Sequence, residues 1–164
     1  MDEEDEQKRM SSLAQTLVAG VIHPDAPLLP TAAIDTFRAL LDTLTRGKMP
    51  WYAHPWYAHR TGHLAPGDPN RLAAEYFWRM YNSCRNRRLF TTTDRRIGLG
   101  PQVMEPGDVV AVIYGSLHPI VLRPLLDEGH YQVCGEAYVH DIMDGQWLAD
   151  QKAKGRKDEV FTFH

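Results

Sequence analysis

Three side chains near the C-terminal end of the sequence could perform acid–base chemistry. They are Glu136, His140 and Asp144. Glu136 and His140 are four residues apart in a stretch with strand character, so we expect them on one face of a strand, with Asp141 pointing away. A histidine between carboxylates is typical of a general base or of a ligand-binding cluster. A small enzyme or ligand-binding domain that uses these residues is therefore one functional hypothesis.

The sequence lacks the further parts that the common classes of enzyme require. It contains no Gly-x-Ser-x-Gly nucleophile elbow, no phosphate-binding P-loop and no GxGxxG dinucleotide motif. Neither Ser116 nor Cys134 has a convincing base with an orienting partner. We therefore expect a non-catalytic protein that has no catalytic residues and no cofactor.

Arg123 and Asp108 are expected to have structural roles. Arg123 ends an apolar strand, where a buried guanidinium group requires a carboxylate, and Glu136 on a neighbouring strand is the expected partner. Arg123 and Glu136 thus join His140 and Asp144 in one candidate structural or ligand cluster. Asp108 follows a Pro-Gly turn, and an aspartate there accepts hydrogen bonds from turn backbone groups.

Histidines and cysteines are the residues most able to bind a metal. His54, His59 and His63 form the only histidine cluster, but it has no nearby carboxylate and no helical HExxH frame. Cys84 and Cys134 are 50 residues apart and form no CxxC pair, so two buried, reduced thiols are expected. The sequence therefore predicts no metal site.

A cluster of arginines is a candidate interaction surface. Its members are Arg85, Arg87, Arg88, Arg95 and Arg96. Solvated arginines that end a helix and pair with acids such as Asp94 account for most of the cluster, and contact with a phosphate group or a partner is the alternative. Nucleic-acid contact through residues 85–96 is a weaker hypothesis, because the formal net charge of the chain is −3.

A tandem duplication lies inside a proline-rich irregular segment, residues 47–70. The tetrapeptide Trp-Tyr-Ala-His occurs at residues 51–54 and again at residues 56–59. Such a loop either tolerates insertion or presents aromatic side chains to the domain or to a partner. The candidate interaction surface accordingly comprises Trp51, Tyr52, Trp56, Tyr57, Arg85, Arg87 and Arg88.

The elements that position these residues follow from hydrophobic periodicity and turn signals. Helices are expected over residues 11–19, over residues 31–46 and after the Asp68-Pro69 start signal. Strands are expected over residues 89–93, 97–101, 109–114, 119–123 and 131–140, with a bulge or tight bend at Gly135. The sequence therefore predicts an α+β protein, with N-terminal helices packed on a small, mostly antiparallel five-strand barrel-like sheet.

The length and composition predict one domain. The chain has 164 residues, of which 43% are hydrophobic and 24% charged. We expect a disordered acidic tail (1–10), a single α+β domain (11–148, helical to 88 and β-rich from 89) and a charged tail (149–164). The acids at residues 2–6 exclude the basic start of a signal peptide, and no apolar run reaches the ~20 residues of a membrane helix. A cytoplasmic location without membrane contact is therefore expected.

Six short stretches together resemble the C-terminal region of fungal heterokaryon incompatibility (HET-domain) proteins. The most specific is Gly-Glu-Ala-Tyr-Val-His-Asp-Ile-Met-Asp-Gly at residues 135–145. The others are residues 16–19, 87–93, 97–101, 106–112 and 119–124. Asp141 and Gln146 depart from the family, which often has glycine and an acid at these places, but both residues suit a turn. The resemblance covers roughly residues 11–20 and 70–148.

The resemblance implies a role in fungal non-self recognition and in the regulation of programmed cell death. Family members usually carry an N-terminal HET domain, the part tied to cell death, and no stretch of this sequence matches it. We therefore expect the companion region alone, as a truncated paralogue, a partial gene model or a free regulatory domain. The expected function is that of a non-catalytic interaction or regulatory module, whose partner is a protein such as a HET-domain protein or a second copy of this chain.

Overall fold

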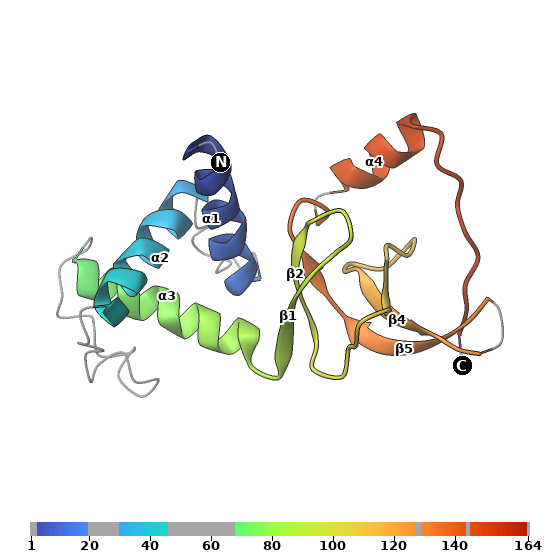
Figure 1. The fold of residues 1–164 in the computed structure, drawn as a ribbon, viewed down its shortest axis with the longest axis horizontal. Helices are drawn as coiled ribbons and strands as arrows, with labels where there is room; N and C mark the ends of the chain where they lie inside the picture. The colour runs from blue at the N-terminus through green and yellow to red at the C-terminus, as the bar shows by residue number, and fades with distance from the viewer. Residues whose placement is uncertain (1–2, 20–29, 46–67, 127–128, 144, 164) are drawn as a thin grey trace. The chain divides into compact units, whose positions relative to one another are not determined.

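The computed structural model describes residues 3–19, 30–45, 68–126, 129–143 and 145–163 (Figure 1). Within it the chain divides into two compact units, Met1–Arg85 and Asn86–His164. We call them the helical unit and the β-rich unit. The mixed α+β class predicted from the sequence is confirmed, and each unit is described by itself below.

The described part of the helical unit contains helices α1 (Glu3–Leu17), α2 (Pro30–Thr45) and α3 (Pro69–Cys84). The predictions for α2 and α3 are confirmed within one or two residues. The prediction of a disordered tail over residues 1–10 is wrong, because α1 begins at Glu3. Acidic side chains in the first turn of a helix interact favourably with its dipole, and Glu4 and Lys8 have the spacing of a stabilising pair.

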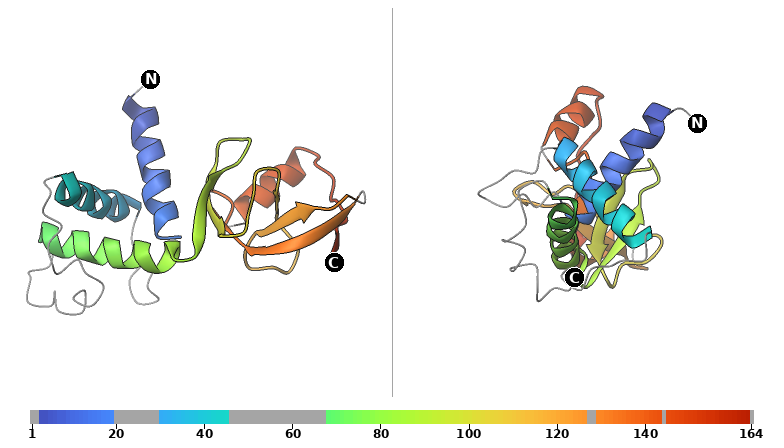
Figure 2. Two further views of the ribbon diagram at one scale, coloured as in Figure 1. Left: turned by 60° about the horizontal axis from the view of Figure 1, so that its bottom comes forward. Right: turned by 90° about the vertical axis from the view of Figure 1, so that its left-hand side faces the viewer.

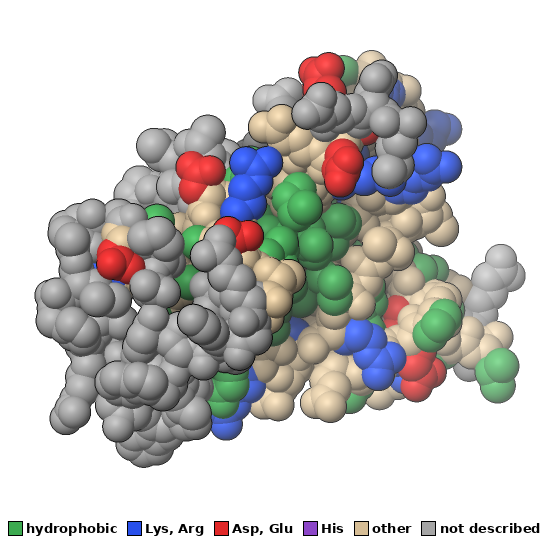
Figure 3. All heavy atoms as spheres, turned by 60° about the vertical axis from the view of Figure 1, so that its left-hand side comes forward, with side chains coloured by type: hydrophobic (Ala, Val, Ile, Leu, Met, Phe, Trp, Pro, Cys, Tyr) green, Lys and Arg blue, Asp and Glu red, His purple; other side chains and the backbone are tan. Residues whose placement is uncertain are grey.

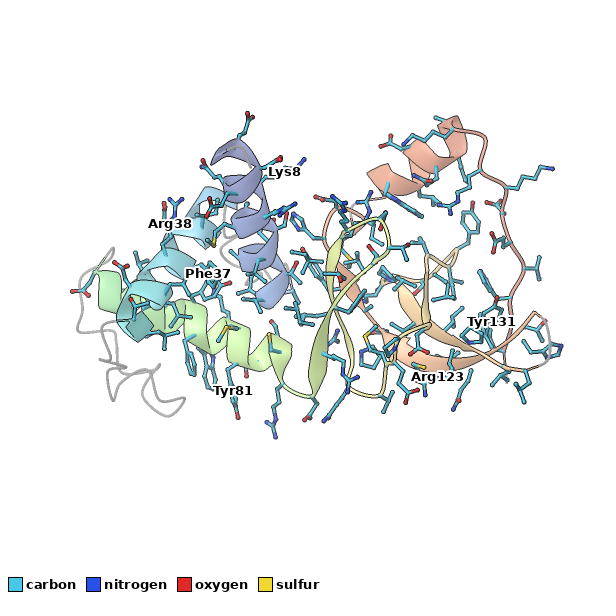
Figure 4. All side chains as sticks on the ribbon, in the orientation of Figure 1. Lys8, Phe37, Arg38, Tyr81, Arg123 and Tyr131 are labelled. Atoms are coloured by element: carbon cyan, nitrogen blue, oxygen red, sulfur yellow. The ribbon has the colours of Figure 1, made fainter. Side chains whose placement is uncertain are left out.

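Tyr76 is at the centre of the helical unit. Only 1% of it is exposed, and it belongs to a cluster with Ala14, Val18, Phe37, Leu40 and Ala73. Its hydroxyl donates a 2.6 Å hydrogen bond to the carbonyl oxygen of Ala14, and its ring centroid is 5.3 Å from that of Phe37, which Figure 4 labels. Burial raises the pKa of Tyr76 above its ordinary value. One side chain of α3 therefore contacts both α1 and α2.

The β-rich unit contains two sheets (Figures 1 and 2). The first has the order β1-β2-β6, and the second has the order β3-β4-β5-β7. All pairings are antiparallel except that of β5 with β7. The bounds are β1 Arg87–Thr91, β2 Ile97–Pro101, β3 Val109–Ala111, β4 Ile120–Pro124, β5 His130–Glu136, β6 Tyr138–Val139 and β7 Thr162–Phe163; helix α4 is Gln146–Ala153.

The described strands do not close into the single five-strand barrel that the sequence suggested. The stretch predicted as one strand over residues 131–140 divides at Ala137, so that β5 and β6 belong to different sheets. The predicted bulge at Gly135 is confirmed, because Val121 pairs with Gly135 and Leu122 pairs with Val133, which leaves Cys134 as the extra residue. Division of the long strand thus produces two sheets.

The charged C-terminal tail predicted over residues 149–164 is also wrong in part. Helix α4 continues to Ala153, and β7 pairs in parallel with β5. The ring of Phe161 meets that of Tyr131 edge-on at 5.1 Å between centroids, which attaches the segment before β7 to β5. β7 has only two residues, which is too short for a strand pattern to be recognised in this polar stretch.

Gly98 allows the first sheet to pack tightly. A Cβ atom on Gly98 would lie 2.5 Å from Cζ of Phe90 and 2.8 Å from the backbone oxygen of Tyr138. The absence of a side chain therefore lets the Phe90 ring lie against β2. Phe90 in turn packs on the buried cluster of the unit, whose members are Met104, Val121, Ala137, Val139 and Ile142.

Candidate interaction site

A cavity of about 1060 Å³ lies within the β-rich unit. Its walls come from β1, from β3 and the turn before it, from α4 and from the segment that leads to β7. Buried and half-buried side chains, among them Phe90, Met104, Val139 and Trp147, form its apolar part. This size and this mixture of apolar and polar groups are typical of a site that binds a ligand or a peptide.

The cavity borders the outer edges of both sheets. It is lined by every residue from 88 to 94 and by every residue from 104 to 114. Neighbouring side chains of a strand point to opposite faces, so a cavity over one face would touch only every second residue. β1 and β3 are the terminal strands of their sheets. The unbroken runs also include turn residues 92–94 and 104–108, and they place the cavity beside β1 and β3, the terminal strands of their sheets.

Three of the side chains that line the cavity interact with one another. The hydroxyl of Tyr114 donates a 2.9 Å hydrogen bond to Oδ1 of Asp158, and Nζ of Lys152 lies 4.8 Å from the centroid of the Tyr114 ring. No motif or spacing in the sequence indicates this group. The two partners in the hydrogen bond are 44 residues apart, and no local pattern links them.

The arginines of the candidate interaction surface have different environments. Nη1 of Arg88 donates a 2.8 Å hydrogen bond to the carbonyl oxygen of Met104. Nε of Arg96 lies 2.8 Å from Oδ2 of Asp94, so the predicted pairing with Asp94 is confirmed. Arg87 and Arg95 are exposed and make no ion pair with any described residue. Their guanidinium groups are therefore available to a partner.

The members of the arginine cluster are divided between the two units. Arg85 ends the helical unit, whereas Arg87 and Arg88 begin the β-rich unit. On the face drawn in Figure 3, described acidic and basic side chains are interspersed, and no broad basic field appears there. This distribution offers no support for nucleic-acid contact on that face.

Arg123, which Figure 4 labels, pairs with Asp108, and the predicted pairing with Glu136 is wrong. Nε and Nη2 of Arg123 donate hydrogen bonds of 2.9 and 3.0 Å to the two carboxylate oxygens of Asp108. The register of the strands explains why Arg123 pairs with Asp108 and not with Glu136. Val109 pairs with Leu122, so Asp108 comes opposite Arg123, while Glu136 pairs with Ile120.

Asp108 also has the turn role that the sequence predicted. Its Oδ2 atom accepts a 2.7 Å hydrogen bond from the backbone N–H of Glu105, and its side chain is only 3% exposed. The guanidinium group of Arg123 and this N–H hold the pKa of Asp108 below its ordinary value. Asp108 therefore connects the turn before β3 to β4.

Replacement of Asp108 by asparagine tests this arrangement through pH. A carboxyl group whose pKa is lowered by folding stabilises the protein fully above its unfolded-state pKa of ~4, and the effect is lost as the pH falls through the folded-state pKa. Wild type should therefore be more stable than Asp108→Asn at pH 7, and the difference should shrink below about pH 4. Urea unfolding at several pH values measures it, and a difference independent of pH would contradict the assignment.

Cys134 lies beside this pair, with its Sγ atom 3.9 Å from Oδ2 of Asp108. Burial and the carboxylate raise the pKa of the Cys134 thiol. A raised pKa is the opposite of what a nucleophilic or metal-binding cysteine needs. Cys84 is likewise a free, half-buried thiol, and it donates a 3.3 Å hydrogen bond to the carbonyl oxygen of Leu17. The surroundings of both cysteines are therefore typical of thiols that pack in the interior of a protein.

The structure places Glu136 and His140 in separate environments. Oε2 of Glu136 lies 3.8 Å from Nδ1 of His118 on an exposed surface. The Nε2 atom of His140 lies 3.2 Å from Oδ1 of Asp141, and its Nδ1 atom lies 3.4 Å from the hydroxyl oxygen of Tyr138. The division of the strand at Ala137 separates the two residues. The expectation of one shared strand face is therefore wrong.

The Tyr138–His140–Asp141 group has the order of a proton relay but not its electrostatics. Burial raises the pKa of Tyr138 to about 12. A catalytic tyrosine that gives up its proton needs a lowered pKa. The group resembles a structural hydrogen-bonded chain more closely than an activated nucleophile.

Comparison with known proteins decides the family. The sequence model of the Het-6 beta-barrel domain matches residues 63–161. The chain belongs to the Het-6 beta-barrel domain family. This result confirms the resemblance to heterokaryon incompatibility proteins and extends it through α4 to the segment before β7.

One curated relative comes from Neurospora crassa and is called heterokaryon incompatibility protein 6, OR allele. It is 36% identical over 83 residues, which are 49% of this chain and 12% of the relative. The chain thus matches a small part of that protein. No solved structure matches the chain.

Several predicted features of this Het-6 beta-barrel family member lie outside the described residues. They are the aromatic residues Trp51, Tyr52, Trp56 and Tyr57, the histidines at 54, 59 and 63, and Asp144. Among the residues that are described, no group of three or more potential metal ligands occurs. None of the described helices has both the length and the apolar character needed to cross a bilayer.

Proposed function

We propose that this chain is a non-catalytic interaction module of the fungal non-self recognition system, and that it binds a protein partner at the cavity of the β-rich unit. Its family relation to heterokaryon incompatibility proteins supports the biological setting. The observation that carries the molecular part is the course of the cavity along the edges of β1 and β3. Strand edges beside an apolar cavity suit recognition of an extended chain.

The side chains around the cavity support binding more than catalysis. Leu89 and Tyr114 line the cavity and are 47% and 56% exposed. These two side chains therefore offer apolar surface to a partner that enters the cavity. The candidate acid–base residues Glu136 and His140 do not line the cavity.

An enzyme that uses Glu136 or His140 is the second candidate, and the chain from Tyr138 through His140 to Asp141 is the observation in its favour. The two candidates predict different effects of substitution. A catalytic role would make Glu136→Gln or His140→Gln inactive, whereas a binding role would make changes in the cavity wall inactive.

Expression of the full chain in a pair of fungal strains that give an incompatibility reaction tests the proposal. Cell death after fusion is measured with a vital dye. Leu89→Asp places a charge in the cavity wall, and Leu117→Asp is the matched control because Leu117 is exposed but does not line the cavity. We expect the effect of the chain on cell death to be lost in Leu89→Asp and kept in Leu117→Asp, Glu136→Gln and His140→Gln.

Two results would overturn the proposal. One is loss of the effect in a folded Glu136→Gln or His140→Gln variant, which would favour catalysis. The other is a folded Leu89→Asp variant that acts like wild type. Circular dichroism and thermal unfolding establish that each variant is folded.

A further inference from the structure

Among the described residues, no strand pairs with the outer edge of β1, and two arginines near this edge form no ion pair. We propose that this edge binds an extended acidic segment of a partner protein, which adds to the β1-β2-β6 sheet as a further strand. This inference rests on the proposed function, since it names the chemistry of the partner at the same cavity. It is carried by the register of β1, by the cavity and by the positions of two arginines.

The hydrogen-bond pattern identifies the groups that face outward. Residues of an antiparallel pair alternate between bonding to the neighbouring strand and pointing away from it. The N–H of Thr92 donates to the carbonyl oxygen of Arg96, so the bonded pairs of the hairpin are those of Phe90 and Arg88. The N–H and C=O groups of Leu89 and Thr91 therefore point away from β2.

The opposite side of β2 agrees with this pattern. Ile97 and Leu99 pair with Thr91 and Leu89, and by the same alternation they must bond on the side away from β1. The carbonyl oxygen of Ile97 indeed accepts a 3.0 Å hydrogen bond from the N–H of His140, and Leu99 pairs with Tyr138 of β6. The assignment of outward groups on β1 thus has independent support.

No described strand pairs with the outward groups of β1, and Leu89 and Thr91 both line the cavity. Unpaired strand edges are templates for pairing with another chain. β1 has five residues, which span ~17 Å at a strand's usual rise. The edge and the space beside it therefore suit a short extended peptide.

The positive charges near β1 determine which kind of partner segment would bind there. Arg87 lies at the start of β1 and Arg95 lies in the turn after it, and both guanidinium groups are exposed without an ion pair among the described residues. A strand added along β1 would have these two charges near its ends. Carboxylates at those places would form charge-assisted hydrogen bonds with the guanidinium groups.

Two other arrangements are less favourable. A second copy of β1 has the sequence Arg-Arg-Leu-Phe-Thr and so contains no carboxylate that could pair with Arg87. The edge of β3 has only three residues, fewer than the five of β1, so it offers fewer backbone groups to a further strand. The edge of β1 is therefore the expected docking site.

The test uses the full chain and a synthetic ten-residue peptide in which glutamate alternates with valine and threonine. We expect the peptide to slow hydrogen exchange at the amides of Leu89 and Thr91, as measured by NMR. N-methylation of alternate peptide amides should weaken binding about tenfold or more, because it removes the ladder hydrogen bonds. The same peptide with lysine in place of glutamate should not bind.

Protein variants separate the contribution of the arginine charges to peptide binding from that of the backbone groups on the edge of β1. The double variant Arg87→Glu with Arg95→Glu should weaken binding of the acidic peptide about tenfold or more. Lys154→Glu is the matched control, since Lys154 is an exposed basic residue of the same unit that does not line the cavity. It should bind the peptide nearly as wild type does.

Three results would overturn the inference. They are no protection of β1 amides at ~1 mM peptide, equal binding of the lysine peptide, and salt-dependent binding of a single-stranded oligonucleotide at β1 without peptide binding. If β1 fails in this assay while Leu89→Asp still removes the effect in fungal cells, the proposed function stands and only the acidic-strand inference falls.

Discussion

Replacement of Tyr76 by alanine is expected to lower the free energy of unfolding of the helical unit by about 4 kcal/mol, the usual range for removing a buried aromatic side chain. Tyr76 is 1% exposed, packs on Phe37 and donates a hydrogen bond to the carbonyl oxygen of Ala14. The substitution therefore creates a cavity among the three helices. Urea unfolding followed by circular dichroism measures the loss.

Two further variants divide the effect of Tyr76 into its parts. Tyr76→Phe keeps the ring and removes the hydroxyl, so a loss of about 1 kcal/mol is expected for the hydrogen bond. Tyr81→Ala is the matched control on the same helix, because Tyr81 is 41% exposed, and its effect should be within about 1 kcal/mol. Equal losses in Tyr76→Ala and Tyr81→Ala would contradict the packing described here.

The second large effect is expected at Leu99 in the β-rich unit. Leu99→Ala should lower the free energy of unfolding by about 3 kcal/mol, because the side chain is buried in the middle of a sheet. Leu99 is 1% exposed, and its partner across the strands, Leu89, is 47% exposed. Hydrogen exchange of the β2 amides reports the stability of this sheet.

Leu89→Ala is the control for Leu99→Ala, since the two leucines pair directly in the register of β1 and β2. Its effect on stability should be within about 0.5 kcal/mol, as for most surface substitutions. Comparable losses in the two variants would show that the edge strand β1 is buried as deeply as β2, the middle strand of the sheet. The greater exposure of Leu89 is also what leaves its side chain available for binding.

Local sequence signals predicted those elements whose cause is local. The periodic apolar residues of α2 and the Asp68-Pro69 start of α3 led to the observed helices, and strand-forming residues located β1, β2 and β4. The first turns of α1 were missed because a run of acids was interpreted as a solvated tail, although acids also favour a helix N-terminus.

The candidate site could be predicted only in part. The pairing of Arg96 with Asp94 and the turn role of Asp108 were evident from residue types and neighbours. The cavity wall of Tyr114, Lys152 and Asp158 was not, because these residues meet through the path of the chain after α4. That segment has a polar composition typical of a solvated tail.

The sequence by itself determined the α+β class, the family and the positions of most helices and strands, since these depend on periodicity, capping and motif order within short windows. Only the tertiary structure decided that Arg123 pairs with Asp108, that Glu136 and His140 separate, and that the edge of β1 borders a cavity. The physical reason is strand register. A bulge at Gly135 and a division at Ala137 determine which side chains meet, and register results from pairing between distant segments.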